Sequence, residues 1–240
     1  DLMLLDVSSQ ESIHSFDRQF RKKHSTLHLL VNNAGIMLAP HKITPDLIEQ
    51  TFATNYLGAF LLTNLLLPSL TASSTQQFPS RVVNVGSEAH RWTPLDIVGG
   101  GKKSGGIVFK LDDINNEDSY QTLDDRWKWY GHSKLALLLF TKHIDTKIPS
   151  FPPQPLNENL TLGMSQRNAT KKVIVNCVHP GLIKSDLFRE GGSCFPPIFG
   201  KLGRVSEFLA TPFFRSASNG ALTTLWAATS PDVVKYHVHG

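Results

Sequence analysis

The chain has 240 residues, of which 40% are hydrophobic and 18% charged, with a formal net charge of +4. This length fits one large domain with a substantial core, and the composition is too apolar for a disordered chain. The basic residues are scattered rather than arranged in a stripe with aromatic residues, so we expect no nucleic-acid partner. The two cysteines, Cys177 and Cys194, have no metal-type spacing and indicate a reducing compartment.

No continuous apolar stretch reaches the ~18 residues that cross a membrane. The longest candidate, Leu57 to Leu70, is interrupted by polar residues and Pro68. The chain begins with Asp1 rather than Met, and no signal-peptide pattern follows. We therefore expect that an N-terminal piece is absent. We expect a cytoplasmic protein, with an upstream anchor to an intracellular membrane left open.

The first part of the chain alternates predicted strands and helices. Leu2 to Val7 predicts a strand, and Ser8 with Glu11 predicts a capping box that opens a helix to about Lys23. A second buried strand, Leu27 to Val31, stops at the run 32–35, Asn-Asn-Ala-Gly. Thr44-Pro45-Asp46 is predicted to open another helix, which is apolar through Leu67 and carries the polar Asn55 near its middle.

The second part continues the alternation with two long insertions. Arg81 to Val85 predicts a third strand, and Val173 to Val178 a fourth. Residues 90–125 are polar and rich in glycine, and residues 149–170 are rich in proline, so both are predicted to be loop insertions. The helix that contains Tyr130 is expected to run to about Lys147, and a last helix covers 217–229.

Polar or glycine residues follow each predicted strand. Strands that are nearly continuous apolar runs alternate with helices, which predicts a parallel sheet covered on both faces. In such an α/β sheet, ligands bind beyond the carboxyl ends of the strands. Singly, these segments are ordinary turns and caps; together they predict a ligand site formed by Asp6-Val7, Asn33-Ala34-Gly35, Gly86-Ser87 and Pro180-Gly181.

Tyr130 and Lys134 are four residues apart on a predicted helix, so the phenol and the ammonium can converge. A positive charge within roughly 4 to 6 Å favours the phenolate and lowers the pKa of the phenol from ~10 toward neutral pH. Tyr130 could then exchange a proton with an alcohol or a developing alkoxide. In a chain with four tyrosines, chance alone gives such a pair about one time in four, so the other segments must support it.

Together and in this order, Asn33-Ala34-Gly35, Ser87, Tyr130-x-x-x-Lys134 and Pro180-Gly181 resemble the short-chain dehydrogenase/reductase family over essentially the whole chain. The run Tyr130 to Ala136 and the 43-residue separation of Ser87 and Tyr130 resemble its retinol dehydrogenase-like branch. The resemblance implies a Rossmann-like, doubly wound parallel sheet in one domain over 1–240. It also implies an NAD(P)-dependent oxidoreductase that interconverts an alcohol and a ketone or aldehyde.

The resemblance further implies roles for individual residues. Tyr130 would be the general acid/base, and Lys134 would lower its pKa and bind the nicotinamide ribose. Ser87 would bind the substrate oxygen, and Asn55 would hold a water that links Lys134 to solvent. The other cofactor positions would be Asp6 and Val7 at the adenine, Asn33, Ala34 and Gly35 at the adenosine ribose, Pro180, Gly181 and Ile183 at the nicotinamide, and Ser185 near the phosphates.

The family begins with a strand, a glycine-rich phosphate loop and a helix, which have no counterpart here. The glycines between 99 and 106 lie far downstream and do not join a strand to a helix. We therefore expect a fold that is truncated at its N-terminus, without its first two strands, and that leaves apolar strand edges unpaired. Either the natural protein is longer or this chain binds dinucleotide poorly. The cofactor is NAD or NADP, and the resemblance favours NADP.

Other functions stay open from the sequence. An inactive fragment or a pseudoenzyme serving as an interaction module is the main alternative. A nucleic-acid role is suggested only by the isoelectric point of 9.1. The extended epimerase/dehydratase group shares the Tyr-x-x-x-Lys pair, but Asn33-Ala34-Gly35 and the short region after Gly181 argue against it.

The substrate is expected to be an apolar alcohol or carbonyl compound. Trp127 and Trp129 would line its site or simply pack the helix, and the phenylalanines between 195 and 214 would form an apolar lid or core. His132 and His179 lack a third ligand at a supporting spacing, so no metal is expected. A homo-oligomer is left open.

Overall fold

The computed structural model describes residues 1–92, 111–151, 172–183 and 215–239. Its sheet has three parallel strands in the order β1 (Leu29–Asn32), β2 (Ser80–Val85) and β3 (Val173–Val178). The register pairs Val31 of β1 with Val83 of β2, and Val83 with Asn176 of β3. The predicted parallel α/β sheet is therefore confirmed.

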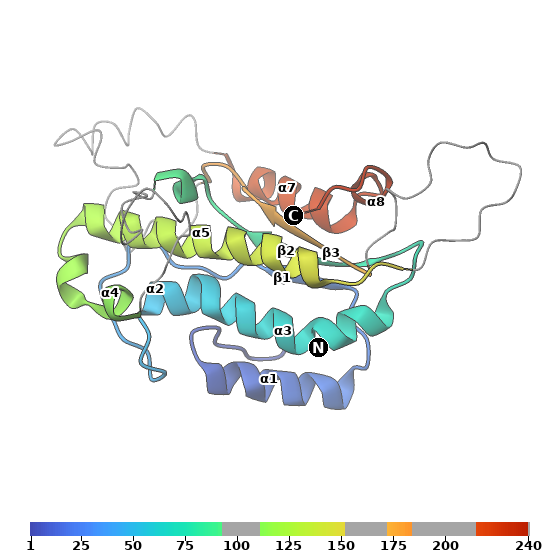
Figure 1. Cartoon of the computed structure of the whole chain (residues 1–240), viewed down its shortest axis with the longest axis horizontal. Helices are drawn as coiled ribbons and strands as arrows, with labels where there is room; N and C mark the ends of the chain where they lie inside the picture. The colour runs from blue at the N-terminus through green and yellow to red at the C-terminus, as the bar shows by residue number, and fades with distance from the viewer. Residues whose placement is uncertain (93–110, 152–171, 184–214, 240) are drawn as a thin grey trace, which may run out of the picture.

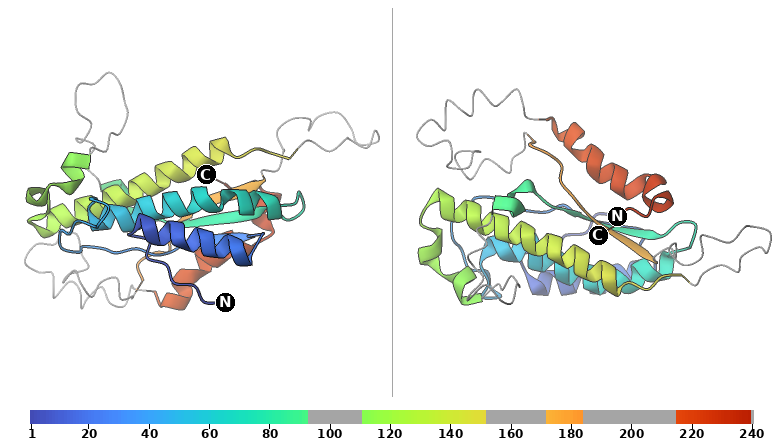
Figure 2. Two further views of the ribbon diagram at one scale, coloured as in Figure 1. Left: turned by 90° about the horizontal axis from the view of Figure 1, so that it is seen from below. Right: turned by 45° about the horizontal axis from the view of Figure 1, so that its top comes forward.

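Helices cover the sheet on both sides (Figure 1). One layer holds α5 (Leu123–Lys147) and the continuous helix formed by α2 (Gln50–Phe52), the π-helix η1 (Ala53–Leu57) and α3 (Gly58–Ser73). The opposite layer holds α7 (Ala217–Thr229) and α8 (Asp232–Lys235), as the turned views in Figure 2 also show. The shorter helices are η2 (Glu88–Trp92), α4 (Leu111–Asn115) and η4 (Glu117–Tyr120).

The core explains why β2 and β3 are apolar at successive positions. Val82 packs with α3 and α5, whereas its neighbour Val83 packs with Ala227 of α7. Because side chains alternate between the faces of a strand, a strand covered on both sides needs apolar residues at both parities. In β3 the same alternation places Val175 in the first layer and Val178 in the second.

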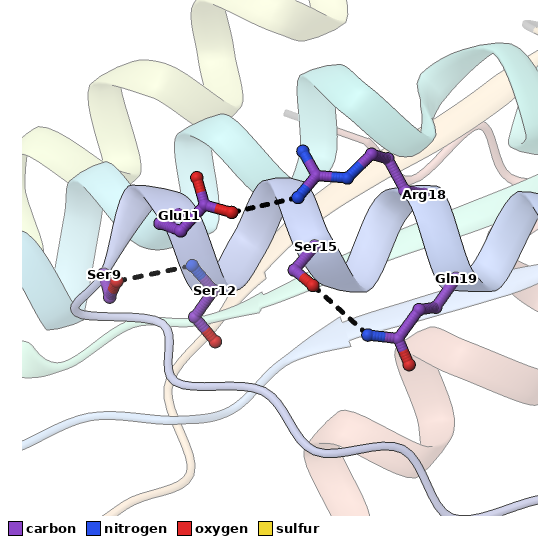
Figure 3. Close-up of polar contacts among 6 residues, drawn as sticks. All are labelled: Ser9, Glu11, Ser12, Ser15, Arg18 and Gln19. Carbon is purple, nitrogen blue, oxygen red and sulfur yellow. Dashed lines mark hydrogen bonds and ion pairs between the residues drawn. The ribbon is translucent and has the colours of Figure 1, made fainter.

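Helix α1 (Gln10–Lys23) packs outside α3, where Ile13 contacts the buried Leu62 and Leu66. Its N-cap is Ser9, whose hydroxyl accepts a hydrogen bond from the Ser12 backbone N–H at 3.3 Å (Figure 3). The predicted helix is confirmed, but the predicted capping box of Ser8 and Glu11 is wrong by one residue. Glu11 instead pairs with Arg18 at 2.9 Å, also drawn in Figure 3.

The predicted strand from Leu2 to Val7 does not form. Residues 1–6 have no regular structure, and Leu2 and Leu4 are 94% and 90% exposed. A strand needs a neighbour to receive its backbone hydrogen bonds. In the described part of the chain no strand lies beside these residues, so the apolar run stays extended without pairing.

Two predicted boundaries also change. The helix expected at Thr44-Pro45-Asp46 begins at Gln50, where the Glu49 carboxylate accepts hydrogen bonds from the N–H groups of Thr51 and Phe52. Asp46 instead accepts from the backbone N–H of Gln10 and so ties this loop to the start of α1. The insertion predicted for 90–125 contains α4, η4 and the beginning of α5, while residues 93–110 and 152–171 lie outside the described ranges.

Among the described residues, one helix, Gln50–Ser73, is long and apolar enough to cross a membrane by length and composition, with a mean hydropathy of 1.3 over its most apolar window. In the fold it contacts α1, α5 and the sheet, and Leu62, Leu66 and Leu70 are buried there. Its apolar composition therefore has an explanation in the core of this α/β fold.

A substitution at Gly58 tests how closely α3 packs against the backbone at Val7. A Cβ added there would lie 2.1 Å from the Val7 carbonyl oxygen. Helix propensity alone would make Gly58→Ala stabilising by about 1 kcal/mol, but we expect destabilisation of roughly 1–3 kcal/mol because the backbone must move. Urea denaturation measures the change, with Ala72→Gly near the exposed end of the same helix giving the propensity effect alone. A more stable Gly58→Ala protein would contradict this packing.

Candidate active site

Tyr130 and Lys134 lie one turn apart on α5, and both are buried, at 4% and 5% exposure. The helix is started by a capping box in which Thr122 accepts from the Asp125 backbone N–H and Asp125 accepts from the Thr122 backbone N–H. The Lys134 Nζ lies 5.9 Å from the centre of the Tyr130 ring. The ammonium therefore lies near the ring of Tyr130, on the same side of the helix.

The Lys134 ammonium is attached to the end of strand β2. Its Nζ donates a hydrogen bond of 2.9 Å to the carbonyl oxygen of Val85, the last residue of the strand. Burial lowers the pKa of this ammonium to about 8, and the nearby Cys177 acts in the opposite direction. The charge therefore lies at the carboxyl end of β2, where ligands of parallel sheets bind.

Ser87 follows β2 and faces Tyr130. Burial raises the pKa of the Tyr130 phenol, and a side-chain hydrogen bond with Ser87 partly opposes this effect. The direction differs from the lowering that the sequence suggested, because loss of solvation outweighs the favourable hydrogen bond with Ser87. In the protein alone the phenol is therefore protonated at neutral pH.

Helix η2 fixes the backbone around Ser87. The Ala89 N–H donates to Ser87 Oγ at 3.2 Å, and His90 Nδ1 lies 2.6 Å from the Ser87 carbonyl oxygen. A carbonyl can only accept, so His90 Nδ1 must carry the hydrogen. Both contacts hold Ser87 where its hydroxyl meets the phenol.

Asn55 lies in the π-helical segment and is 1% exposed. Its Oδ1 accepts from the Ile36 N–H at 2.8 Å, and its Nδ2 donates to the Ile36 carbonyl at 2.9 Å. The same Nδ2 donates to Ser133 Oγ at 2.9 Å. Asn55 thereby joins the loop after β1 to the helix that carries Tyr130, and π-helical turns often mark functional sites.

Gly35 borders the same group of residues. A Cβ added there would lie 3.2 Å from Asn55 Oδ1 and 3.4 Å from Lys134 Nζ. A side chain would therefore crowd the two polar atoms, and glycine keeps this space open. The structure thus brings Gly35, Asn55, Ser87, Tyr130 and Lys134 together.

The loop after β3 lies beside the loop after β2. Burial lowers the pKa of His179, Glu88 raises it and His90 lowers it further, so these three side chains are neighbours. Gly181 has a φ of +87°, a conformation that favours glycine. Gly181 lies against the Arg215 side chain, and Ile183 pairs with Arg215 and packs on Gly220 of α7, so the cofactor roles of Pro180, Gly181 and Ile183 stay predictions. Ser185 lies outside the described residues.

Four other predicted cofactor positions lie apart from Tyr130 and Lys134. The Asp6 carboxylate accepts from the backbone and hydroxyl of Ser8 at the start of α1. The Val7 backbone lies against Gly58. Asn33 and Ala34 are exposed in the loop after β1. In the part of the chain that the structure describes, no hydrogen bond or ion pair links these four residues to Tyr130 or Lys134, and their cofactor roles stay predictions.

The two tryptophans before Tyr130 have different surroundings. Trp127 meets the Tyr130 ring edge-on at 6.0 Å, in an apolar cluster with Met37, Leu38 and Ala89. Trp129 stacks on Tyr120 and donates its indole N–H to the Ser119 carbonyl, so it belongs to the core. Only Trp127 is placed beside the phenol.

Sequence reasoning missed Ser133 and His90. Ser133 lies three residues after Tyr130 and so shares its helical face, a spacing that could have identified it. The contact of His90 with the Ser87 carbonyl depends on the tight turn of η2, and no sequence pattern considered above signals it.

The lowered pKa of Lys134 has a consequence for stability. Between pH 8 and 10.5, an unfolded chain binds a proton at Lys134 that the folded chain does not, so the free energy of unfolding rises with pH. We expect Lys134→Met to remove this rise and to be more stable at pH 7 by up to about 3 kcal/mol, less the loss of the Val85 bond.

Urea denaturation at pH 7 and pH 10 measures the difference between the two proteins. The exposed Lys142 on the same helix provides the control Lys142→Met, which should leave the pH dependence unchanged. An equal stability difference between Lys134→Met and wild type at both pH values would contradict the assignment.

Comparison with known proteins finds relatives that are named as dehydrogenases. The sequence profile of the short chain dehydrogenases matches residues 2–94. The chain is 36% identical over 236 residues to the short-chain dehydrogenase TIC 32 A, chloroplastic, of Brassica napus, covering 97% of this chain and 60% of that protein. It is 30% identical to human polyprenol dehydrogenase, with 97% and 58% covered, and 32% identical to human retinol dehydrogenase 14, with 95% and 54% covered.

The chain thus spans about 60% or less of the length of these relatives. Among solved structures, the Pseudomonas aeruginosa RhlG/NADP complex matches with a TM-score of 0.55 and 20% identity, over 95% of this chain and 70% of that one. An uncharacterised protein from Mycobacterium paratuberculosis matches with a TM-score of 0.50 and 26% identity, over 94% and 57%. The fold is therefore Rossmann-like. The matching profile and these relatives show that the chain is similar, over nearly its whole length, to members of the short-chain dehydrogenase/reductase family.

Proposed function

We propose that the protein is an NAD(P)-dependent oxidoreductase that interconverts an alcohol and a ketone or aldehyde. One observation carries this proposal. Three polar groups, the Ser87 hydroxyl, the Tyr130 phenol and the Lys134 ammonium, gather at the carboxyl end of β2. Two of them can share a proton with a substrate oxygen, and the third carries the compensating charge.

The roles follow from the charge that develops on the substrate. During carbonyl reduction the oxygen becomes an alkoxide, and the hydroxyls of Ser87 and Tyr130 donate hydrogen bonds to it. Tyr130 then gives its proton to this oxygen, a transfer that suits a phenol which burial keeps protonated. The Lys134 ammonium stabilises the phenolate that remains. In alcohol oxidation the phenolate takes the proton back.

The residues present fit the nicotinamide end of a dinucleotide. Gly35 leaves open the space between Asn55 Oδ1 and Lys134 Nζ, and Pro180, Gly181 and Ile183 in the turn after β3 are proposed contacts of the nicotinamide. The nicotinamide would supply the hydride acceptor or donor. Lys134 and Asn55 would hold its ribose or a water beside it, while Asp6, Val7, Asn33, Ala34 and Ser185 are proposed contacts for the rest of the cofactor. NADP is favoured, since the similar RhlG structure contains it.

We propose an apolar substrate. The surroundings of the Tyr130 ring are Met37, Leu38, Ala89 and the partly buried Trp127. These side chains offer apolar contact and exclude water from the phenol. Two relatives are named polyprenol and retinol dehydrogenases, which supports the same class of alcohol.

Removing the phenolic hydroxyl tests the proposed general acid/base. We expect Tyr130→Phe to lower kcat by about 10³-fold, because the proton donor is lost while the ring and its packing remain. The matched control is Tyr120→Phe, which removes another buried phenol, one that stacks on Trp129 away from Ser87. Steady-state oxidation of apolar alcohols with NADP and NAD measures both. Full turnover by Tyr130→Phe would exclude this mechanism.

The raised pKa of Tyr130 predicts opposite pH trends for the two directions. Oxidation needs the phenolate, which is scarce at neutral pH, so its kcat/KM should rise from pH 7 toward pH 9. Reduction uses the protonated phenol and should be sustained at neutral pH. Initial rates in both directions with one alcohol–carbonyl pair test this, and oxidation that slows over the same range would refute it.

An inactive family member that acts as an interaction module is the second candidate. It is favoured by the absence of a glycine-rich phosphate loop from this sequence and by the single neighbour of β1 in the described sheet. Fluorescence titration of the folded chain with NADP and with NAD separates the two candidates. Binding of either dinucleotide supports the oxidoreductase, and failure of both supports the interaction module.

We keep a cytoplasmic location as a prediction, with an intracellular membrane as its alternative. One relative is named as chloroplastic. Fractionation of cells that express the natural protein, with detection in the soluble, membrane and organelle fractions, decides between them.

A further inference from the structure

We propose that Ser133 is a positioning residue of the active site, which fixes the Asn55 amide relative to Tyr130 and Lys134. The inference rests on the proposed function for its catalytic consequence. The hydroxyl of Ser133 joins two elements, the π-helix η1 and the helix α5, at the turn that carries the proposed acid/base.

The Ser133 hydroxyl is buried, and both its donor and its acceptor positions are used in hydrogen bonds. Its side chain is fully buried, at 0% exposure, on the same helical face as Tyr130. Its O–H donates to the Tyr130 carbonyl oxygen at 2.7 Å, so its oxygen can only accept from Asn55 Nδ2, at 2.9 Å. Loss of the hydroxyl would leave a buried amide N–H unpaired, which the structure must relieve by moving Asn55.

Both N–H groups of the Asn55 amide have fixed partners, and its Oδ1 accepts one hydrogen bond and keeps a second acceptor position. Nδ2 donates to the Ile36 carbonyl and to Ser133, and Oδ1 accepts from the Ile36 N–H. The Ile36 contacts tie the amide to the loop after β1, and Ser133 alone among these partners ties it to α5. Ser133 therefore sets how the loop after β1 sits against the helix of Tyr130.

The position of the Asn55 amide affects the site beside Gly35, where it lies close to the Lys134 ammonium. The Cβ position of Gly35 is within 3.4 Å of both Asn55 Oδ1 and Lys134 Nζ. A water or cofactor hydroxyl held near this point would depend on the spacing of the two atoms. A misplacement of about 1 Å can cost up to ~10²-fold in rate, so a residue that fixes the spacing matters without touching the substrate.

The same helix offers a matched control in Thr141. Thr141 is also 0% exposed, its Oγ1 donates to the Leu137 carbonyl at 2.8 Å, and it accepts from Asn84 Nδ2 at 2.8 Å. Each of the two hydroxyls therefore donates to a carbonyl of its own helix and accepts from an asparagine amide, two turns apart, and Thr141 also contacts Cys177. Only that of Ser133 leads to Asn55.

The experiment compares Ser133→Ala with Thr141→Val in the 240-residue chain, since each change deletes one hydroxyl and leaves one buried amide N–H without its acceptor. Both should lower the melting temperature. Only Ser133→Ala should lower kcat, by about 10-fold with KM unchanged within ~2-fold. It should also speed hydrogen exchange of the Ile36 amide by about 10-fold, because that N–H is protected by Asn55.

The activity measurement and the hydrogen-exchange measurement test the proposed function and the role of Ser133 separately. If the wild-type chain turns over no alcohol with either cofactor, the proposed function fails, and exchange at Ile36 still decides the role of Ser133. Faster Ile36 exchange in Ser133→Ala alone supports the positioning role. Equal exchange in the two variants, or kcat that falls in both with their stability, overturns it.

Discussion

A hydrogen bond from the buried Lys134 ammonium to the Val85 carbonyl holds the chemical site to the sheet. Strand β2 ends there, and the chain that leaves it carries Ser87 to the phenol of Tyr130. Removing an ammonium from water is costly, which is why its pKa falls to about 8. Burial of the Lys134 ammonium lowers the stability of the fold at the place where the proposed reaction needs a positive charge, and active sites commonly lower stability in this way.

Asparagine–hydroxyl pairs connect α5 with the rest of the molecule. In the C-terminal part of α5, Thr141 accepts from Asn84 of β2, whose Oδ1 in turn accepts from Asn32 of β1 at 2.7 Å. Nearer the site, Ser133 meets Asn55. Leu137 and Phe140, which lie between these pairs on α5, pack in the apolar core. The directional bonds add a fixed register, which non-directional apolar packing does not provide.

The sequence predicted the strands of the sheet and the placement of Tyr130 and Lys134 on one helical face, because both depend on local patterns. Buried apolar runs fix β2 and β3, and the four-residue spacing fixes Tyr130 and Lys134 on one face. The strand at Leu2 failed because pairing is not encoded in the run itself. The pKa of Tyr130 moved opposite to expectation, since its burial comes from distant segments such as Met37 and Ala89. Ser133 likewise depends on a tertiary contact, with Asn55, whereas the contact of His90 depends on the local turn of η2.

The outer edge of β1 is open in the described sheet, which affects the tendency of the chain to associate with other chains. In the described sheet β1 has one neighbour, and its Leu29 and Val31 are 39% and 38% exposed. The backbone amides on the other edge form a template to which a foreign strand can add. Crowding of chains during synthesis or refolding would then favour intermolecular sheets over monomers, so yield depends on dilution. A lysine at position 29 or 31 would protect that edge while leaving the chemistry at the end of β2 untouched.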